Sequence, residues 1–371
     1  MRILQITSHL DVGGVTSAVL ALSKTLQARG HHVTIASAGG AREPELEALG
    51  IAARRLPLRT SVEFGPGVWQ AGRRLAVGLR AEPVDVMHAH TRVAQVVADR
   101  LSRACGIPYV TTWHGFFRPN LGRRWWPCFG DAAIAVSEPV AEHLRRDLHC
   151  PPARLRVIPN GIDAAAFMSG EDAPAARRFQ QRCGLPPDAP VVGSVSRLVA
   201  AKGLDQLIRS LPLVRAQVPK ARLLLVGDGQ ARADLERLAA ALGVRDAVHF
   251  AGAVSDVRPA YAAMQVAVFA PADREGFGLS LLEAMASGRP VVAVARGGGS
   301  QWVLEQGGVG ALVEPGDVEG LSAAISRWFH DPTLAAQAAA QARAVVVERY
   351  SLARMVEAVE QIYQEIVKRP S

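Results

Sequence analysis

Short apolar runs alternate along this chain with longer stretches in which apolar residues recur at helical spacing. Residues 2–7 form the first such run, a turn at Gly13-Gly14 follows, and residues 15–29 repeat apolar side chains every three or four positions. Later runs of the same kind in the first half are 33–37, 84–89, 109–112, 132–136 and 155–158. Such alternation is typical of a mostly parallel sheet with helices on both faces. The pattern predicts an α/β fold of the Rossmann-like type.

The same pattern restarts after a polar break, which predicts a second domain of the same type. Ala, Pro and polar residues cluster over 164–190, and we interpret this stretch, centred on 169–174, as a linker. The second set of expected strands is 191–196, 222–226, 248–251, 266–270 and 291–294. The 371 residues suffice for two cores, and we expect an N-terminal domain at 1–165 and a C-terminal domain at 166–351.

The last helix, expected near 352–368, has no partner left in sequence order. Crossing back to the first domain would bury its apolar face. An alanine-rich helix around 335–344 precedes it.

Positive charge is concentrated in the first half of the chain. Residues 1–165 carry 20 Lys and Arg against 13 Asp and Glu, whereas residues 166–371 carry 22 against 21. Only four of the 42 basic residues are lysine, so a coding bias can explain arginine over lysine, but it does not explain the asymmetry. We therefore expect any acidic partner to contact the first half, and we expect no nucleic-acid partner.

No uncharged run reaches the roughly 18 residues that a membrane span requires. The first residues turn polar too soon for a signal peptide, so we expect a cytoplasmic location, with peripheral attachment to the inner face of the membrane left open. The cysteines are widely spaced and form no C-x-x-C pair, which suits neither a disulfide framework nor a zinc site. They are Cys105, Cys128, Cys150 and Cys183.

The most informative segment carries two carboxylates, Glu275 and Glu283, eight positions apart at the start of an expected helix. Gly276 and Gly278 remove side chains where a ligand could approach the backbone. Amides at the helix start, near Leu279, are unpaired and favour an anion. Glu283 can accept two hydrogen bonds from a sugar diol, as acidic residues do for ribose in other nucleotide folds. The helix dipole explains a single acidic residue near a helix start, so either glutamate alone would not indicate a ligand site. The two glutamates together with the glycines and the preceding strand favour a nucleotide site.

This segment resembles the E-x7-E signature of the family-4 retaining glycosyltransferases, which share the GT-B fold. Three further elements also resemble that family: Gly193-Ser194-Val195-Ser196-Arg197-Leu198 with Lys202-Gly203, the L-x-x-x-G-x-G turn at 223–229, and Ile158-Pro159-Asn160-Gly161-Ile162-Asp163. The match is strong over 191–317 and looser in the first half, as expected where acceptors differ. The resemblance implies two Rossmann-like domains that face each other across a cleft, with the donor held between them.

The resemblance also implies which residues bind the donor, a nucleoside-diphosphate sugar that is a substrate and not a cofactor. Its diphosphate brings about two negative charges, which need fixed positive partners. Arg197 and Lys202 would bind the diphosphate in place of a metal and stabilise it as it leaves. Glu275 would contact hydroxyls of the transferred sugar, and Glu283 would bind the ribose.

Backbone groups complete the donor site that the resemblance implies. The amides of Phe277, Gly278 and Leu279 would hold the sugar and phosphate, and the main chain of Ala253 and Val254 would meet the edge of the base. The turn Gly13-Gly14 would let the first helix approach the same phosphates.

His114 directly follows an expected strand, at the position of the family's active-site histidine. It could bond to the donor sugar or orient the acceptor hydroxyl. A solitary histidine is more often a structural hydrogen-bonding group, and we interpret His88 and His90 as mainly structural. One departure from the family is Gln301, which stands where relatives commonly have the glutamate of G-G-x-x-E. We assign it no role, and the surroundings of the donor sugar stay open on this point.

The first half also contains the cluster Arg123-Arg124-Trp125-Trp126. Basic residues beside tryptophans are what an interfacial membrane contact needs. An ordinary half-buried loop explains the same residues equally well.

We therefore expect a retaining glycosyltransferase that moves a sugar to a hydroxyl of a sugar or lipid-linked acceptor, in the synthesis of an envelope polysaccharide or glycolipid. The acceptor would attack from the face that the diphosphate leaves, within a closed, dry cleft, and no nucleophile is visible. The fingerprints of dinucleotide oxidoreductases (G-x-G-x-x-G), P-loop NTPases and D-x-D metal-dependent transferases are absent. A non-catalytic nucleotide-sugar-binding protein, or an epimerase or hydrolase of the same fold, stays open until turnover is assayed.

Overall fold

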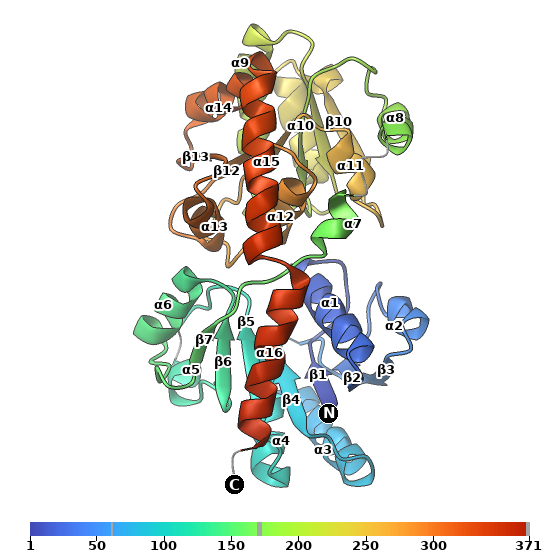
Figure 1. Ribbon diagram of the computed structural model, residues 1–371, viewed down its shortest axis with the longest axis vertical. Helices are drawn as coiled ribbons and strands as arrows, with labels where there is room; N and C mark the ends of the chain where they lie inside the picture. Colours follow the sequence, from blue (N-terminus) through green and yellow to red (C-terminus); the bar gives the residue numbers. More distant parts are fainter. Residues whose placement is uncertain (61, 120, 169–172, 369–371) are drawn as a thin grey trace. The chain divides into compact units, whose positions relative to one another are not determined.

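The computed structural model describes residues 1–60, 62–119, 121–168 and 173–368 (Figure 1). The chain forms two compact units. The first contains Met1–Gly161 together with the chain from Leu352 onward, and the second contains Ile162–Ser351. Each unit is built on one parallel sheet, so the expected α/β fold with two Rossmann-like sheets is confirmed.

The sheet of the first unit has seven parallel strands in the order β3-β2-β1-β4-β5-β6-β7. The strands are β1 Arg2–Ile6, β2 His32–Ser37, β3 Ala52–Arg55, β4 Val86–Ala89, β5 Tyr109–Trp113, β6 Ala132–Ala135 and β7 Leu155–Val157. The helices of this unit are α1 Gly14–Ala28, α2 Pro44–Ala48, α3 Pro66–Ala81, α4 Arg92–Cys105, α5 Leu121–Trp125, α6 Glu138–Asp147 and α16 Leu352–Val367. The β3 strand was not predicted from the sequence.

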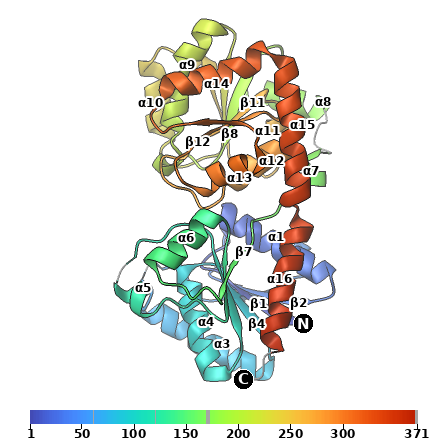
Figure 2. The same ribbon diagram turned by 60° about the vertical axis from the view of Figure 1, so that its left-hand side comes forward.

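Helices cover both faces of this sheet, because alternate residues of each strand point to opposite sides. In β1, Ile3 packs in a cluster with α1 and α16, whereas Leu4 packs in a cluster with α3 and α4. The final helix lies beside α1 in both ribbon views (Figures 1 and 2). Its buried residues are Met355, Val356, Val359, Ile362, Tyr363 and Ile366. The last helix therefore packs on the first unit, as expected.

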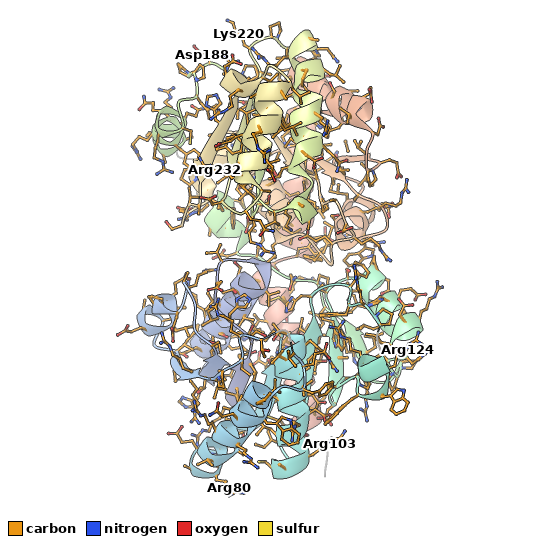
Figure 3. All side chains as sticks on the ribbon, turned by 180° about the vertical axis from the view of Figure 1, so that it is seen from behind. Arg80, Arg103, Arg124, Asp188, Lys220 and Arg232 are labelled. Carbon is orange, nitrogen blue, oxygen red and sulfur yellow. The ribbon has the colours of Figure 1, made fainter. Side chains whose placement is uncertain are left out.

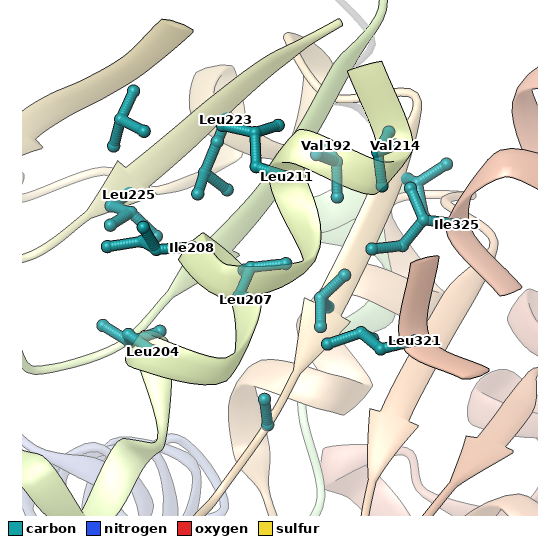
Figure 4. Packing of buried hydrophobic residues seen from close by; sticks show 14 of the residues in the cluster. Val192, Leu204, Leu207, Ile208, Leu211, Val214, Leu223, Leu225, Leu321 and Ile325 are labelled. Carbon is teal, nitrogen blue, oxygen red and sulfur yellow. The ribbon is translucent and has the colours of Figure 1, made fainter. Parts of the chain in front are cut away.

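The sheet of the second unit has six parallel strands in the order β10-β9-β8-β11-β12-β13. The strands are β8 Val191–Val195, β9 Arg222–Val226, β10 Val248–Gly252, β11 Val266–Phe269, β12 Val291–Val294 and the unpredicted β13 Ala311–Val313. The α-helices are α7 Ala164–Met168, α8 Ala173–Arg182, α9 Leu204–Gln217, α10 Arg232–Ala241, α11 Arg258–Ala262, α12 Leu279–Ala286, α13 Gly299–Gly307, α14 Val318–His330 and α15 Pro332–Arg349. Figure 4 shows one face of this core, where Leu207 and Leu211 of α9 lie beside Leu321 and Ile325 of α14.

The stretch that we interpreted as a linker is largely helical. The boundary between the units falls between Gly161 and Ile162, and α7 and α8 belong to the second unit. Phe179 of α8 is buried and gives this short helix an apolar face, which the polar composition of the stretch concealed. Residues 169–172, at the centre of the expected linker, lie outside the described residues.

All four cysteine thiols are free, as expected, and Cys128 and Cys150 are buried. Within the described ranges, no helix combines the length and the apolar character needed to cross a membrane.

A buried ion-pair network holds the first unit together around Glu63. This carboxylate is 12% exposed and accepts hydrogen bonds from Arg92 Nε at 2.9 Å and Arg123 Nε at 2.7 Å. Arg92 also donates to the carbonyl oxygens of Trp126 and Pro127. Burial acts to raise the pKa of Glu63, but its bonds to the two guanidinium groups outweigh burial and hold the pKa below its usual 4.5.

We predict that Glu63→Ala lowers the free energy of unfolding by about 3 kcal/mol at pH 7, because it leaves Arg92 buried without a counter-charge. Since the pKa of Glu63 is depressed in the folded state, its contribution is present above pH 4.5 and is lost as the pH falls below that value. Urea unfolding at pH 7 and pH 3.5 measures both effects, with the difference between wild type and variant expected to shrink at pH 3.5.

Glu45→Ala is the matched control, because Glu45 pairs with Arg42 on the surface. Such a pair contributes at most about 1 kcal/mol. Equal losses for the two variants would contradict the importance of the Glu63 network.

Candidate functional site

Most of the expected donor-binding residues lie at one edge of the second sheet. In a parallel sheet all strands end at the same edge, and open α/β folds bind their ligands there. Arg197 follows β8, the segment from Glu275 to Leu279 follows β11, and Ala253 and Val254 follow β10. Because β8 and β11 are neighbours in the sheet, the first two groups belong to adjacent strand ends.

Lys202 and Glu275 form a direct ion pair at this edge. The Lys202 Nζ atom lies 2.7 Å from both carboxylate oxygens of Glu275, although the residues are 73 positions apart. Lys202 ends a 3-10 turn, Ala200–Lys202, and the next residue, Gly203, has φ of 57° and is the N-cap residue of α9. A Cβ at Gly203 would lie 2.2 Å from the carbonyl oxygen of Ala270, so glycine is required for this close approach.

Arg197 is exposed, and no described residue forms an ion pair with its guanidinium. It is thus an unpaired positive charge in the same connection between β8 and α9 as Lys202, whose charge is matched by Glu275. This strand edge can accept an anion without first breaking an internal pair.

The start of α12 is an uncapped helix N-terminus. Its N-cap residue, Gly278, has φ of 96° and no side chain to bond the first amides of the helix. The preceding loop is held from outside, since the Gly299 N–H donates to the Glu275 carbonyl oxygen at 2.8 Å. A Cβ at Gly278 would lie 3.0 Å from the ring of Phe269. The backbone amides of Phe277, Gly278 and Leu279 thus lie at an uncapped helix start, a position that suits an anion.

Glu283, in the second turn of α12, is held by a tyrosine that the sequence analysis did not identify. The Tyr261 hydroxyl lies 3.0 Å from both Glu283 Oε2 and the Ser280 carbonyl oxygen. Burial, together with the charge of Glu283, raises the pKa of Tyr261 well above its usual 10.0, so the phenol stays protonated. No motif marks Tyr261, because its role depends on the packing of α11 against the start of α12.

Gln301 closes the loop at the start of α13. Its Oε1 atom accepts from the Gly297 N–H at 2.6 Å, and its Nε2 atom donates to Glu305 at 2.6 Å. The glutamine thus joins the preceding loop at Gly297 to Glu305 of its own helix. A carboxylate at this position could accept from Gly297 but could not donate to Glu305.

The loop with Ala253 and Val254 borders a hollow of about 730 Å³. Helix α8 forms the other wall through Arg178, Phe179 and Arg182. The hollow thus offers an aromatic ring and positive charge opposite the expected base-binding backbone.

In the first unit, His114 directly follows β5 and contacts a second histidine. Its Nε2 atom lies 3.3 Å from His90 Nδ1, and His90 Nε2 lies 2.7 Å from Gln5 Oε1. Burial lowers the pKa of His114 to about 4 and that of His90 well below 6.5. Both imidazoles are therefore neutral at pH 7.

The hydrogen-bond chain continues from Gln5 into the final helix. Gln5 Nε2 donates to the Tyr363 hydroxyl at 3.2 Å, and that oxygen lies 2.6 Å from His88 Nδ1. His88 Nε2 in turn lies 2.7 Å from the Thr112 hydroxyl. Burial lowers the pKa of His88 to about 3. Residues that we interpreted as mainly structural thus connect to the expected active-site histidine.

Helix α1 begins at Gly14 with Gly13 as its N-cap residue and no side-chain cap. A Cβ at Gly13 would meet no atom within 4 Å, so the backbone here is open. In the described part of the chain, no three His, Cys, Asp or Glu side chains converge as a metal site requires.

The Arg123-Arg124-Trp125-Trp126 cluster divides into two exposed and two internal residues. Arg124 is exposed and Trp125 is 88% exposed. Arg123, in contrast, binds Glu63, and the Trp126 indole N–H donates to Asp99 at 2.6 Å. Only the central pair is available to a partner.

Two family models together match most of the chain. Residues 12–166 match "Glycosyltransferase Family 4", and residues 176–345 match "Glycosyl transferases group 1". The D-inositol 3-phosphate glycosyltransferase of Acidothermus cellulolyticus is 32% identical over 376 residues, with 90% of this chain and 82% of that protein covered.

Two further relatives match over a shorter length. The GDP-mannose-dependent alpha-(1-6)-phosphatidylinositol monomannoside mannosyltransferase of Mycolicibacterium smegmatis is 40% identical over 194 residues. The lipopolysaccharide core biosynthesis glycosyltransferase LpsE of Rhizobium meliloti is 38% identical over 177 residues. The alignments cover 50% and 48% of this chain, and 50% of each relative's length.

Solved structures share the fold of the whole chain. A glycosyltransferase from Rickettsia africae superposes with a TM-score of 0.87 at 22% identity, covering 100% of this chain and 99% of that one. Anabaena Alr3699/HepE in complex with UDP-glucose gives 0.86 at 23% identity, with 98% and 100% covered. WaaG, involved in lipopolysaccharide biosynthesis, gives 0.76 at 20% identity, with 99% and 100% covered. At these identities the likeness shows the GT-B fold alone.

We predict that Gly278→Ala destabilises the second unit more than Gly243→Ala does. Both glycines have positive φ, which costs an alanine about 1 kcal/mol. A Cβ at Gly243 meets nothing within 4 Å, whereas one at Gly278 presses on Phe269 and adds about 1 kcal/mol of overpacking. Urea unfolding of the full chain measures the difference, and equal losses would mean that the turn before α12 relaxes freely.

Proposed function

Since the chain belongs to the family-4 glycosyltransferases, we propose that it transfers a sugar from a nucleoside-diphosphate sugar to an acceptor hydroxyl, with retention at the anomeric carbon. The observation that carries the donor site is the strand edge of the second unit. There the Lys202–Glu275 pair, the exposed Arg197 and the uncapped start of α12 follow two neighbouring strands.

The diphosphate of the donor would bind to fixed positive groups at this edge. Arg197 offers a guanidinium without an internal counter-charge, and the start of α12 offers backbone N–H groups. The ammonium of Lys202 has three donors, so it can bind a phosphate oxygen while it still contacts Glu275. Charge on the diphosphate grows as the glycosidic bond breaks, so these groups would stabilise the transition state more than the bound donor.

Two glutamates would bind the hydroxyls of the donor. Glu275 is fixed by Lys202 and would accept from the transferred sugar, while Glu283 is fixed by Tyr261 and would accept from the ribose. Each carboxylate oxygen can accept more than one bond, so both can keep their present partners when the donor binds. Rigid carboxylates of this kind orient the sugar at little entropic cost.

The first unit would contribute His114 and the acceptor site. The neutral imidazole would bond to a hydroxyl of the donor sugar or of the acceptor near the anomeric carbon. Gly13 and Gly14 would bring the open start of α1 to the phosphates.

A lipid-linked or other envelope acceptor is the class that we propose. The name of one relative refers to a phosphatidylinositol monomannoside, which is a lipid, and that of another to biosynthesis of the lipopolysaccharide core. The first unit carries 23 Lys and Arg against 15 Asp and Glu, whereas the second carries 19 of each. A net +8 on one unit favours an anionic surface as its partner.

A panel of nucleotide sugars tests the proposal directly. A donor that binds only the folded protein must raise the melting temperature, by an amount that grows with its concentration. The stabilising donor is then incubated with lipid-linked and soluble acceptors, and NMR of the product gives the anomeric configuration. Inversion, or hydrolysis without transfer, would contradict the proposed reaction.

We predict that Glu283→Ala weakens donor binding, whereas Glu275→Ala mainly lowers kcat. A lost hydrogen bond to a charged group contributes about 1.5–3 kcal/mol, which corresponds to roughly 10- to 200-fold. Tyr261→Phe, which only loosens Glu283, should weaken binding by roughly 2- to 10-fold. Titration calorimetry and initial rates separate the two effects.

Glu319→Ala is the matched control, because Glu319 is an exposed carboxylate in the first turn of another helix of the same unit. It should leave binding and turnover unchanged. Wild-type behaviour of purified Glu283→Ala and Glu275→Ala would refute the donor site.

We also propose that the first unit binds anionic membranes through exposed basic and aromatic side chains. Figure 3 shows Arg80, Arg103 and Arg124 at the periphery of this unit. Trp125 is 88% exposed beside Arg124, and an exposed tryptophan is suited to the interfacial layer of a bilayer. Each basic residue near an anionic surface contributes about 1 kcal/mol, so binding should be reversible and sensitive to salt.

We predict that Arg124→Ala/Trp125→Ala reduces sedimentation with phosphatidylglycerol-containing liposomes by roughly tenfold or more at low salt. Arg209→Ala/Leu213→Ala removes a comparable exposed pair from α9 of the second unit and should leave sedimentation unchanged. Equal pelleting of the two double variants, or no pelleting of wild type at low salt, would favour a soluble acceptor.

A further inference from the structure

We propose that Gln5, His90 and Tyr363 are positioning residues that hold His114 in one neutral tautomer. In this tautomer Nε2 carries the proton, and Nδ1 is left bare to accept a hydrogen bond from a hydroxyl. The inference rests on the proposed function, in which His114 meets a hydroxyl of the substrate.

The amide of Gln5 sets the direction of the whole chain of hydrogen bonds. With the Gln5 amide in its present orientation, Oε1 faces His90 Nε2 at 2.7 Å and can only accept, so His90 Nε2 carries the proton of that ring. A neutral imidazole has one N–H, so His90 Nδ1 is bare and must accept. His114 Nε2, 3.3 Å away, is therefore the donor, and His114 Nδ1 has no proton.

The other end of the Gln5 amide is fixed by the final helix. Its Nε2 atom donates to the Tyr363 hydroxyl, which leaves the Tyr363 proton for His88 Nδ1. His88 then donates from Nε2 to the Thr112 hydroxyl. If the Gln5 amide were reversed, every bond in the chain would have to reverse, because each neutral ring can donate only once. The hydroxyl of Tyr363 in α16 thus helps to set the proton position on a histidine at the end of β5.

The chain has a single direction only while its rings are neutral. Burial keeps the pKa of His88 near 3 and that of His114 near 4, and burial with the neighbouring rings keeps the pKa of His90 well below 6.5. A protonated His90 would donate from both nitrogens and would force the His114 proton onto Nδ1. The burial of His88 and His90 thus keeps the cluster neutral at pH 7.

The consequence is a ring that can accept a hydrogen bond but cannot donate one to the substrate. No bond from a described residue reaches His114 Nδ1, and the ring is only partly buried. A bare nitrogen binds a hydroxyl and repels a phosphate oxygen, so the position selects an O–H group. With its pKa near 4 the ring also cannot hold a proton at pH 7, so it orients the hydroxyl and does not act as a base.

The tautomer can be measured on the whole protein without substrate. Long-range ¹H–¹⁵N spectra of histidine-labelled protein distinguish bare from protonated ring nitrogens, and the His114→Phe variant assigns the signal among the ten histidines. We expect His114 to show one bare Nδ1 and one protonated Nε2 from pH 6 to pH 8. A proton on Nδ1, a mixture of tautomers or a charged ring in wild type would overturn the proposal, and His114→Phe serves only to assign the signal.

Three variants test which residues fix the tautomer. Gln5→Met and His90→Phe break the chain next to His114, and both should give mixed tautomers and a fall in kcat of roughly 3- to 10-fold. Tyr363→Phe removes only the distant hydroxyl and should give a smaller change of the same kind. Tyr109→Phe is the matched control, because it removes another buried hydroxyl, which donates to Asp99 outside the chain.

The control separates positioning from general damage. Tyr109→Phe should lower stability yet leave the His114 tautomer and kcat at wild-type values. A pure Nε2–H tautomer in all three chain variants would overturn the inference. If instead His114→Phe retains full turnover, the proposed role of His114 fails while the tautomer result stands by itself.

Discussion

A parallel sheet has to be covered on both faces, and this requirement organises both units of the chain. Adjacent residues of one strand point to opposite sides, as Ile3 and Leu4 do in β1, so each side needs its own layer of helices. In the first unit, α3 and α4 supply one layer, but α1 needs a partner for the other. That partner is α16, from the far end of the chain.

The same requirement determines where the polar side chain of Gln5 finds its hydrogen-bond partners. Gln5 shares a strand face with Ile3, so its amide lies under the helix layer and must find partners there. It finds Tyr363 of α16 and His90 beyond β4, and the chain of bonds reaches His114 beyond β5. A buried polar network is stable only when every member is satisfied, and here one amide satisfies both branches.

The central strands and the two sheets could be predicted from the sequence, because buried strands are continuous apolar runs. The edge strands could not. β3 reads Ala-Ala-Arg-Arg and is partly exposed, while β13 has three residues, so neither gives a recognisable run. The Glu275 segment and the start of α12 were predicted because glycines, carboxylates and a strand lie close in sequence.

Contacts between distant parts of the chain were not predictable in this way. Lys202 and Glu275 were each expected near the donor, but no pattern indicated that they pair directly. Tyr261 and Tyr363 are single residues whose partners come from other helices or strands. The Arg123-Arg124-Trp125-Trp126 cluster was recognisable in the sequence, but the sequence did not indicate which of its side chains face inward. The structure shows that Arg123 binds Glu63 and that Trp126 donates to Asp99.

The return of α16 also bears on how the protein is made. The ribosome completes the first unit's strands early, but the 190 residues of Ile162–Ser351 must follow before Met355 and Val359 can cover them. At about 5–20 residues per second, this leaves an apolar sheet face uncovered for roughly 10 to 40 seconds. The second unit is continuous in sequence and needs no later segment to cover its sheet, so only the older half of the nascent chain waits for a distant helix.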